Sequence, residues 1–334
     1  MENDRGGDVG TIRPPPTVWA LHDGKIGMAN QVLGLAEAVG LPFLEKRLAV
    51  RAPWRHLAPS LWLRPLAALG PEGDRLAPPW PDLIIACGRN SVAPSLATKR
   101  ASRGRTLWVH IQDPRFARGK ADLLVVPGHD PARGGNVLTT LGAVHRVTPA
   151  RLATEAQRFA QAFAALPRPR VAVLLGGDNR VYHYTSEQFA AFAEQLAGLA
   201  RGGVGLMVTP SRRTGAAVKA LLHKRLAGLP ARIWDGSGEN PYFGMLGLAD
   251  AVIVTADSVS MVSEAAATGK PVHVVPLQGG SAKFARFHAA MERAGITRPF
   301  RGAIEAWRYA PPDDNARAGA AIRDLLARRF AEVA

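Results

Sequence analysis

The sequence predicts an α/β protein of two doubly wound, Rossmann-like parallel-sheet domains that face a cleft. Three observations support this. The 334 residues exceed one ordinary domain and suit two of about 150 residues each. Short, nearly continuous apolar runs alternate with helical patterns, as strands buried on both faces of a sheet require. The alternation stops at the proline-rich run 167–170 and then restarts.

The expected elements follow in chain order. Strands of the first half are predicted at 17–21, 82–86, 106–111 and 122–126. Strands of the second half are predicted at 171–175, 204–208, 231–234, 250–255 and 271–275. A helix should start after Thr185, because Gln188 completes a capping box. We therefore expect a disordered leader (1–16), a first domain (17–166), a second domain (167–310) and a C-terminal helix (311–334).

The composition limits the compartment and the partners. A net charge of +15 attracts anions, whether nucleic acid, an anionic membrane surface or phosphorylated ligands, although arginine-rich chains also reflect GC-rich genomes. The single Cys87 excludes an internal disulfide framework, and the nine histidines lack metal-ligand spacing, so no metal is expected. With no apolar run near the roughly 20 residues of a spanning helix and no signal-like start, we expect a soluble cytoplasmic protein. A peripheral place on the inner face of the membrane stays open.

Polar, glycine-rich turns follow the predicted strands of the second half. They span 176–179, 209–213, 235–240 and 255–258. Ligands of open parallel sheets bind at the carboxyl ends of the strands, so these loops should converge on one rim. Gly176 and Gly177 have two readings, an N–H nest for a phosphate or a tight turn.

A helix is expected from Ser258 to Thr268, with its amino end aimed into the cleft. Its free N–H groups and positive dipole end suit an anion, and small Ser258 and Ser260 let a phosphate approach, although serine is also a good cap. Glu264, one turn further, is suited to accept two ribose hydroxyls in a water-lined cleft with no buried partner. The alternative is a solvated helix acid.

Two arginines, Arg212 and Arg213, precede another predicted helix. Cations at that end oppose the helix dipole and need an anion nearby, unless they are simply solvent-facing charges of a basic protein.

The first half carries the candidate base and acceptor contacts. The loop 22–27 fits neither GxGxxG nor GxxxxGK[ST], so neither a classical dinucleotide fingerprint nor a P-loop is present. Asp23 and Asp113 both follow strands, and either is a candidate general base, although an aspartate before proline, as at Asp113, is more often a turn former. The candidate acceptor contacts are Lys25, Asn30 and Gln31.

The run TADSVSMVSEAAATGKPVHVVPLQG, residues 255–279, resembles the donor-binding motif of GT-B glycosyltransferases, especially the peptidoglycan lipid-intermediate N-acetylglucosaminyltransferases. The resemblance implies that Glu264 binds the ribose, Ser258 and nearby amides the diphosphate, and Gly176-Gly177 the phosphates. The full set of candidate nucleotide-binding residues is Gly176, Gly177, Asp178, Asn179, Ser211, Arg212, Arg213, Asn240, Asp257, Ser258, Ser260, Glu264 and Gln278.

A second resemblance covers nearly the whole chain, from Val18 to about Phe300. The chain is similar to the mitochondrial-fission "elongated mitochondria" family, whose plant members are implicated in recruiting the division machinery to the mitochondrial outer membrane. That role implies no particular chemistry. The segments that carry it include DGKIGMANQ (23–31), HIQDPR (110–115), VVPGHD (125–130), GGDNRVYHY (176–184), TPSRRT (209–214) and GENPYFGML (238–246).

The segment 51–65 mixes Trp54, Leu57, Leu61 and Trp62 with arginines. Aromatic and basic residues together suit a membrane interface, whereas the alternative packs both tryptophans inside the first domain.

Together these features predict a nucleotide-sugar-binding protein, a metal-independent glycosyltransferase acting on a cell-envelope or lipid-linked acceptor. The second domain would hold the donor and the first the acceptor, with the nucleotide-sugar as substrate and no further cofactor. The rival hypothesis is a non-catalytic, membrane-associated adaptor that retains the fold. Nucleic-acid binding rests on charge alone and is the weakest of the three.

Overall fold

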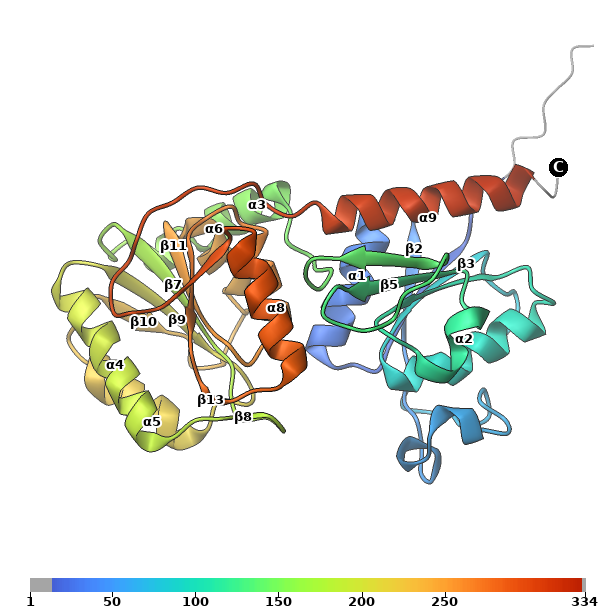
Figure 1. Ribbon diagram of the computed structural model, residues 1–334, viewed down its shortest axis with the longest axis horizontal. Coiled ribbons are helices and arrows are strands. Elements are labelled where there is room, and N and C mark those ends of the chain that lie inside the picture. Colours follow the sequence, from blue (N-terminus) through green and yellow to red (C-terminus); the bar gives the residue numbers. More distant parts are fainter. Residues whose placement is uncertain (1–13, 332–334) are drawn as a thin grey trace, which may run out of the picture.

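The computed structural model of the protein describes residues 14–331, and it contains two six-stranded parallel sheets (Figure 1). The expected leader lies, up to residue 13, outside the described residues. The first sheet has the order β2-β1-β3-β4-β5-β6, formed by β1 (Val18–His22), β2 (Phe43–Arg47), β3 (Leu83–Cys87), β4 (Leu107–Ile111), β5 (Leu123–Pro127) and β6 (Val137–Thr140).

The second sheet repeats this architecture. Its order is β10-β9-β7-β11-β12-β14, formed by β7 (Arg170–Leu175), β9 (Gly205–Pro210), β10 (Ala231–Ile233), β11 (Ala251–Thr255), β12 (Val272–Val275) and β14 (Thr297–Pro299). A small antiparallel pair, β8 (Tyr182–His183) and β13 (Gln278–Gly279), lies outside it. Two Rossmann-like domains, as the sequence predicts, are therefore present.

Helices cover both faces of each sheet. They are α1 (Ile26–Val39), α2 (Arg89–Ala101), α3 (Pro149–Phe159), α4 (Ser186–Arg201), α5 (Ala216–Leu226), α6 (Tyr242–Leu248), α7 (Val259–Ala266), α8 (Ala282–Arg293) and α9 (Asp314–Ala331). One half of the expected capping box is present, since the Thr185 side chain accepts the Gln188 N–H at the start of α4. Within residues 14–331, no helix is both long and apolar enough to span a bilayer.

The buried strands lie where the apolar runs predict them, whereas three edge strands were not expected. β1, β3, β4 and β11 are buried along their whole length, which their mostly apolar sequences reflect. The edge strand β2 reads FLEKR and is largely exposed, so its sequence carries no apolar run. The edge strands β6 and β14 are likewise short and partly polar.

Two helices pack on the domain other than the one they directly follow in the chain. α3, which falls before the expected boundary at 166, packs on α6, where Gly247 leaves room for the Leu152 carbonyl. α9 crosses back and packs on α1 (Figure 1). Its first residues are fastened there, because the Asp314 carboxylate accepts the N–H groups of Leu141 and Gly142.

Candidate functional site

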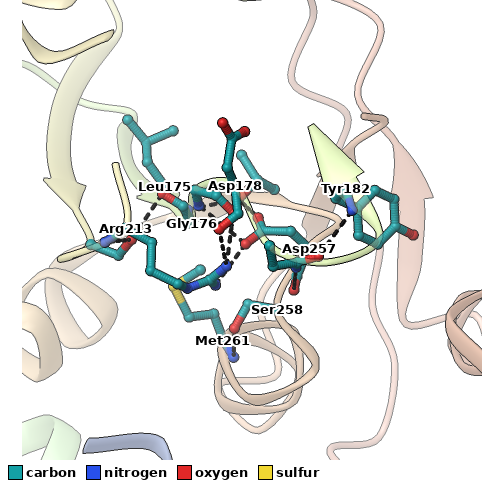
Figure 2. A network of polar contacts seen from close by, with 12 residues as sticks. Leu175, Gly176, Asp178, Tyr182, Arg213, Asp257, Ser258 and Met261 are labelled. Atoms are coloured by element: carbon teal, nitrogen blue, oxygen red, sulfur yellow. Dashed lines mark hydrogen bonds and ion pairs between the residues drawn. The ribbon is translucent and has the colours of Figure 1, made fainter. Parts of the chain in front are cut away.

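Asp257 organises the carboxyl edge of the second sheet (Figure 2). Its carboxylate is fully buried, in the turn between β11 and α7. It accepts the Gly177 N–H at 3.1 Å, the Thr255 hydroxyl at 2.6 Å and the Arg213 guanidinium at 2.7 Å. A buried charge needs such partners, so these contacts fix the three loops against one another.

The turn at Gly176 and Gly177 requires glycine at both positions. A Cβ on Gly176 would lie 2.1 Å from the Asp257 carboxylate, and one on Gly177 would lie 2.1 Å from the Arg213 carbonyl oxygen. The Gly176 N–H donates to Thr255 Oγ1, and the Gly177 N–H donates to Asp257. Of the two readings, the tight turn describes this arrangement, with a carboxylate of the chain itself on the amide that a phosphate would use.

The anion beside Arg213 is therefore part of the protein. Arg213 lies in the turn before α5, whose cap is Gly215, and it also donates to the Gly177 carbonyl oxygen at 2.7 Å. Its neighbour Arg212 is exposed.

Four other candidate residues of this edge hold turns. Asn179 Oδ1 accepts the N–H groups of Val181 and Tyr182, and Asp178 accepts that of Tyr184. Ser211 donates to the Gly176 carbonyl oxygen, and Asn240 accepts the Tyr242 N–H. Gln278 is exposed on β13, opposite His183 in the antiparallel pair with β8.

The amino ends of α7 and α1, which belong to different domains, lie close together. Ser258 caps α7 by accepting the Met261 N–H. A Cβ on Gly27, in the first turn of α1, would lie 3.8 Å from Ser260 Oγ. Among the described residues, no acceptor binds the N–H groups of Val259 and Ser260 in α7 or of Ile26 and Gly27 in α1. The two positive dipole ends, whose four N–H groups have no acceptor among the described residues, therefore lie close together where the domains meet, a region here called the interdomain space.

Glu264 is buried, contrary to the expected water-lined position. Its side chain accepts the Tyr242 hydroxyl at 2.5 Å and the Asn30 amide at 3.3 Å, and the residue is only 3% exposed. The short α7 packs between the domains, which removes this turn from solvent. Burial raises the pKa of Glu264 to about 7, although both hydrogen bonds oppose the rise.

The two candidate bases differ in their surroundings. Asp113 accepts the Arg115 N–H at 2.8 Å and is held by the Arg118 guanidinium, which lowers its pKa. Asp23 is paired with Lys25 and accepts the Asn90 amide at 3.3 Å. Asp113 thus has the ion pair and turn of a structural residue, whereas Asp23 lies beside the free amino end of α1.

The three candidate acceptor contacts also differ in their surroundings. Asn30 reaches Glu264 in the other domain, and Lys25 is largely exposed. Gln31 is buried and donates to the Gly27 carbonyl oxygen.

Two residues of the site were not identified from the sequence. Thr255 and Tyr242 hold Asp257 and Glu264, respectively. Thr255 ends an apolar strand run, and Tyr242 follows the Asn-Pro pair that opens α6, so each had a positional signal but no pattern of its own. No group of three or more His, Cys, Asp or Glu side chains within residues 14–331 could hold a metal ion.

Solved structures of the same fold are known. A Listeria monocytogenes protein assigned as a UDP-N-acetylglucosamine 2-epimerase matches with a TM-score of 0.59 and 13% identity, over 96% of this chain and 98% of that one. Arabidopsis thaliana UGT89C1 complexed with UDP matches with a TM-score of 0.52 and 13% identity, over 94% and 91%. Further matches hold UDP or UDP-N-acetylglucosamine. The fold is GT-B-like.

The sequence has relatives at higher identity. It is 33% identical over 277 residues to the Arabidopsis thaliana mitochondrial fission protein ELM1, a match that covers 75% of this chain and 65% of the relative. The chain thus spans about two thirds of the length of that protein. The family described as mitochondrial fission ELM1 matches residues 26–326, and the chain belongs to this family.

Proposed function

We propose that the interdomain space binds a nucleotide-sugar and that the protein is a metal-independent glycosyltransferase acting on a cell-envelope or lipid-linked acceptor. The observation that carries the proposal is the closeness of the two helix amino ends, where the N–H groups of Ile26, Gly27, Val259 and Ser260 have no acceptor among residues 14–331. Oriented N–H groups and two dipole ends are what a diphosphate needs. Solved structures of this fold that hold UDP or a UDP-sugar support the class of ligand.

The ribose is assigned to Glu264. Its carboxylate lies one to two turns inside α7, and among the described residues the hydrogen-bond donor to its Oε1 is an amide from the opposite domain. A ribose hydroxyl would replace Asn30 on that oxygen while Tyr242 keeps the other. In this arrangement the diphosphate lies toward the helix amino ends.

Asp23 is assigned as the general base. It lies beside the amino end of α1, where a hydroxyl in the first domain would approach the donor, and its partners are an exposed lysine and an amide. Asp113 is less suited, because Arg118 lowers its pKa and holds its carboxylate. Departing diphosphate charge would be stabilised by the helix ends.

The buried Asp257 favours a second candidate, an adaptor without catalysis. Its carboxylate already accepts hydrogen bonds from the Gly177 N–H and the Arg213 guanidinium, which leaves fewer donors for a phosphate. An adaptor of this kind would transfer no sugar, whether or not it binds a nucleotide.

Calorimetry with nucleoside diphosphates and their sugars separates these possibilities. Native protein should prefer the ribonucleotide over its 2′-deoxy form, and Glu264→Gln should bind both alike, roughly 10- to 150-fold more weakly than native protein binds the ribonucleotide. Equal affinities of native and variant protein would remove Glu264 from the site. Transfer to a lipid extract by the native protein would exclude the adaptor.

A further inference from the structure

Exposed leucines gather in one projecting segment, residues 51–64, here called the apolar tip. Leu57, Leu61 and Leu63 are 36%, 59% and 88% exposed, and they are three of the six large exposed apolar side chains among the described residues. The tip consists of two short 3-10 turns, Trp54–His56 and Pro59–Leu61. It projects, in blue, from the first domain (Figure 1). Clustered exposed apolar side chains mark an interaction site.

The two tryptophans of the segment fasten the tip and hold the leucines outward. Trp62 is buried at 5% exposure, in a small core with Ala68 and Ala93, and Trp54 packs against it. The backbone of Leu57 is held too, because its carbonyl oxygen accepts the Arg89 guanidinium at 2.6 Å. Of the two sequence readings, the inward packing applies to Trp62. The side chains available to a partner are the leucines.

The charge around these leucines has one sign. No Asp or Glu occurs between Glu45 and Glu72, whereas Arg51, Arg55 and Arg64 are exposed in the tip. Such a surface complements an anionic partner with an apolar layer beneath its charges. A phospholipid bilayer has that layering, and it accepts a projecting tip without a matching concave surface.

We propose that the apolar tip inserts Leu57, Leu61 and Leu63 into the interface of a bilayer that carries anionic phospholipid. Arg55 and Arg64 then lie among the headgroups. The tip follows the carboxyl end of β2. The amino end of α1 follows the carboxyl end of β1, which pairs with β2 in parallel. The bilayer contact is thus on the same edge of the sheet as the candidate site. The link to a lipid-linked acceptor rests on the proposed function, but vesicle binding needs no nucleotide.

Flotation of the full chain with vesicles tests the proposal. Vesicles of phosphatidylcholine are compared with vesicles in which phosphatidylglycerol replaces a third of it, without nucleotide. Native protein should float with the anionic vesicles only, and Leu57→Ser/Leu61→Ser/Leu63→Ser should lose most of that binding. Arg55→Gln/Arg64→Gln should bind roughly 30-fold more weakly, at about fivefold for each arginine.

A matched control removes the same charge elsewhere. Arg232→Gln/Arg301→Gln takes two exposed arginines from the second domain, and it should bind vesicles as native protein does. Equal losses in the two arginine variants would overturn the tip as the contact, and so would a leucine variant that binds normally. Because Leu63 is the most exposed leucine, Leu63→Ser alone repeats the test if the triple variant misfolds.

Native protein that binds neither vesicle overturns the lipid assignment. The leucines would then serve a protein contact, and sedimentation that depends on Leu63 would identify a second copy of this chain. Nucleotide binding measured on the same samples separates the membrane proposal from the proposed function. The tip variants should bind nucleotide as native protein does, because they leave the interdomain space unchanged.

Discussion

The Asn30 amide and the Glu264 carboxylate meet between the two domains, with 3.3 Å from nitrogen to oxygen. They are 234 residues apart in the chain, and each belongs to a helix whose amino end is free. This contact makes the ribose candidate part of the domain interface. Binding at Glu264 and the relative position of the domains are therefore coupled.

If a ribose hydroxyl replaces Asn30, removing the amide should favour the nucleotide. Above a pH of about 7, where Glu264 is charged, we expect Asn30→Ala to bind a nucleoside diphosphate about tenfold more tightly, since a hydrogen bond to a charged group contributes roughly 1.5 to 3 kcal/mol and part of it is regained by water. Calorimetry measures this. Weaker binding would instead make Asn30 a direct contact of the ligand.

The raised pKa of Glu264 predicts a pH-dependent stability. In the folded protein the Glu264 carboxyl stays protonated up to a pH of about 7, whereas the ordinary pKa of a glutamate is 4.5. The stabilisation is therefore complete below about pH 4.5 and is lost as the pH rises through about 7. Relative to Glu264→Gln, the native free energy of unfolding should fall by about 3 kcal/mol over this interval. Urea unfolding of both proteins at several pH values tests it, and parallel curves would contradict it.

Arg213 and Arg212 should differ sharply in their effect on folding. Arg213→Ala leaves the fully buried Asp257 carboxylate without its cation, and we expect a loss of roughly 1 to 3 kcal/mol in the free energy of unfolding, because Arg213 itself is 41% exposed and the Thr255 and Gly177 donors remain. Arg212 is exposed, so Arg212→Ala should change it by less than about 0.5 kcal/mol. Denaturant unfolding compares the two variants, and similar losses would mean that the ion pair between Arg213 and Asp257 does not stabilise the fold.

A proline can remove one free N–H while the helix stays intact. Ile26 is the first residue of α1, its side chain is 52% exposed, and Lys25 before it is extended, as a residue before proline prefers. Ile26→Pro should weaken diphosphate binding roughly tenfold or more. Ser186→Pro is the matched control at the start of α4, after the extended Thr185. Unchanged affinity in Ile26→Pro would exclude this amide from the phosphate site.

The two aspartates should separate in a transfer assay. Asp23→Asn should lower turnover by roughly 10²- to 10⁴-fold if Asp23 is the general base, whereas Asp113→Asn should affect mainly the stability of its loop. The pH dependence of turnover provides the control, because a variant without the general base should no longer show the fall in turnover at acidic pH. A larger effect at Asp113 would reverse the assignment.

The sequence predicts the interior of this fold better than its edges and its site contacts. Buried strands such as β3, LIIAC, are apolar throughout and can be recognised locally. The edge strand β2, FLEKR, is stabilised by its pairing with β1 and has no such pattern. Site positions follow from the strand ends, but their partners do not. Asp257 and Arg213 are 44 residues apart, and only the folded sheet brings them together.

The return of α9 to the first domain determines how the domains can move. The chain passes from the first domain to the second after His145 and comes back before Asn315, and these two residues are hydrogen-bonded to each other. The two segments that connect the domains are thus hydrogen-bonded side by side at this point. A double connection of this kind resists sliding and twisting of one domain over the other, and it permits rotation about a single line. If the domains open, the amino ends of α1 and α7 should therefore separate by that one rotation, and closing should restore the same contacts between them.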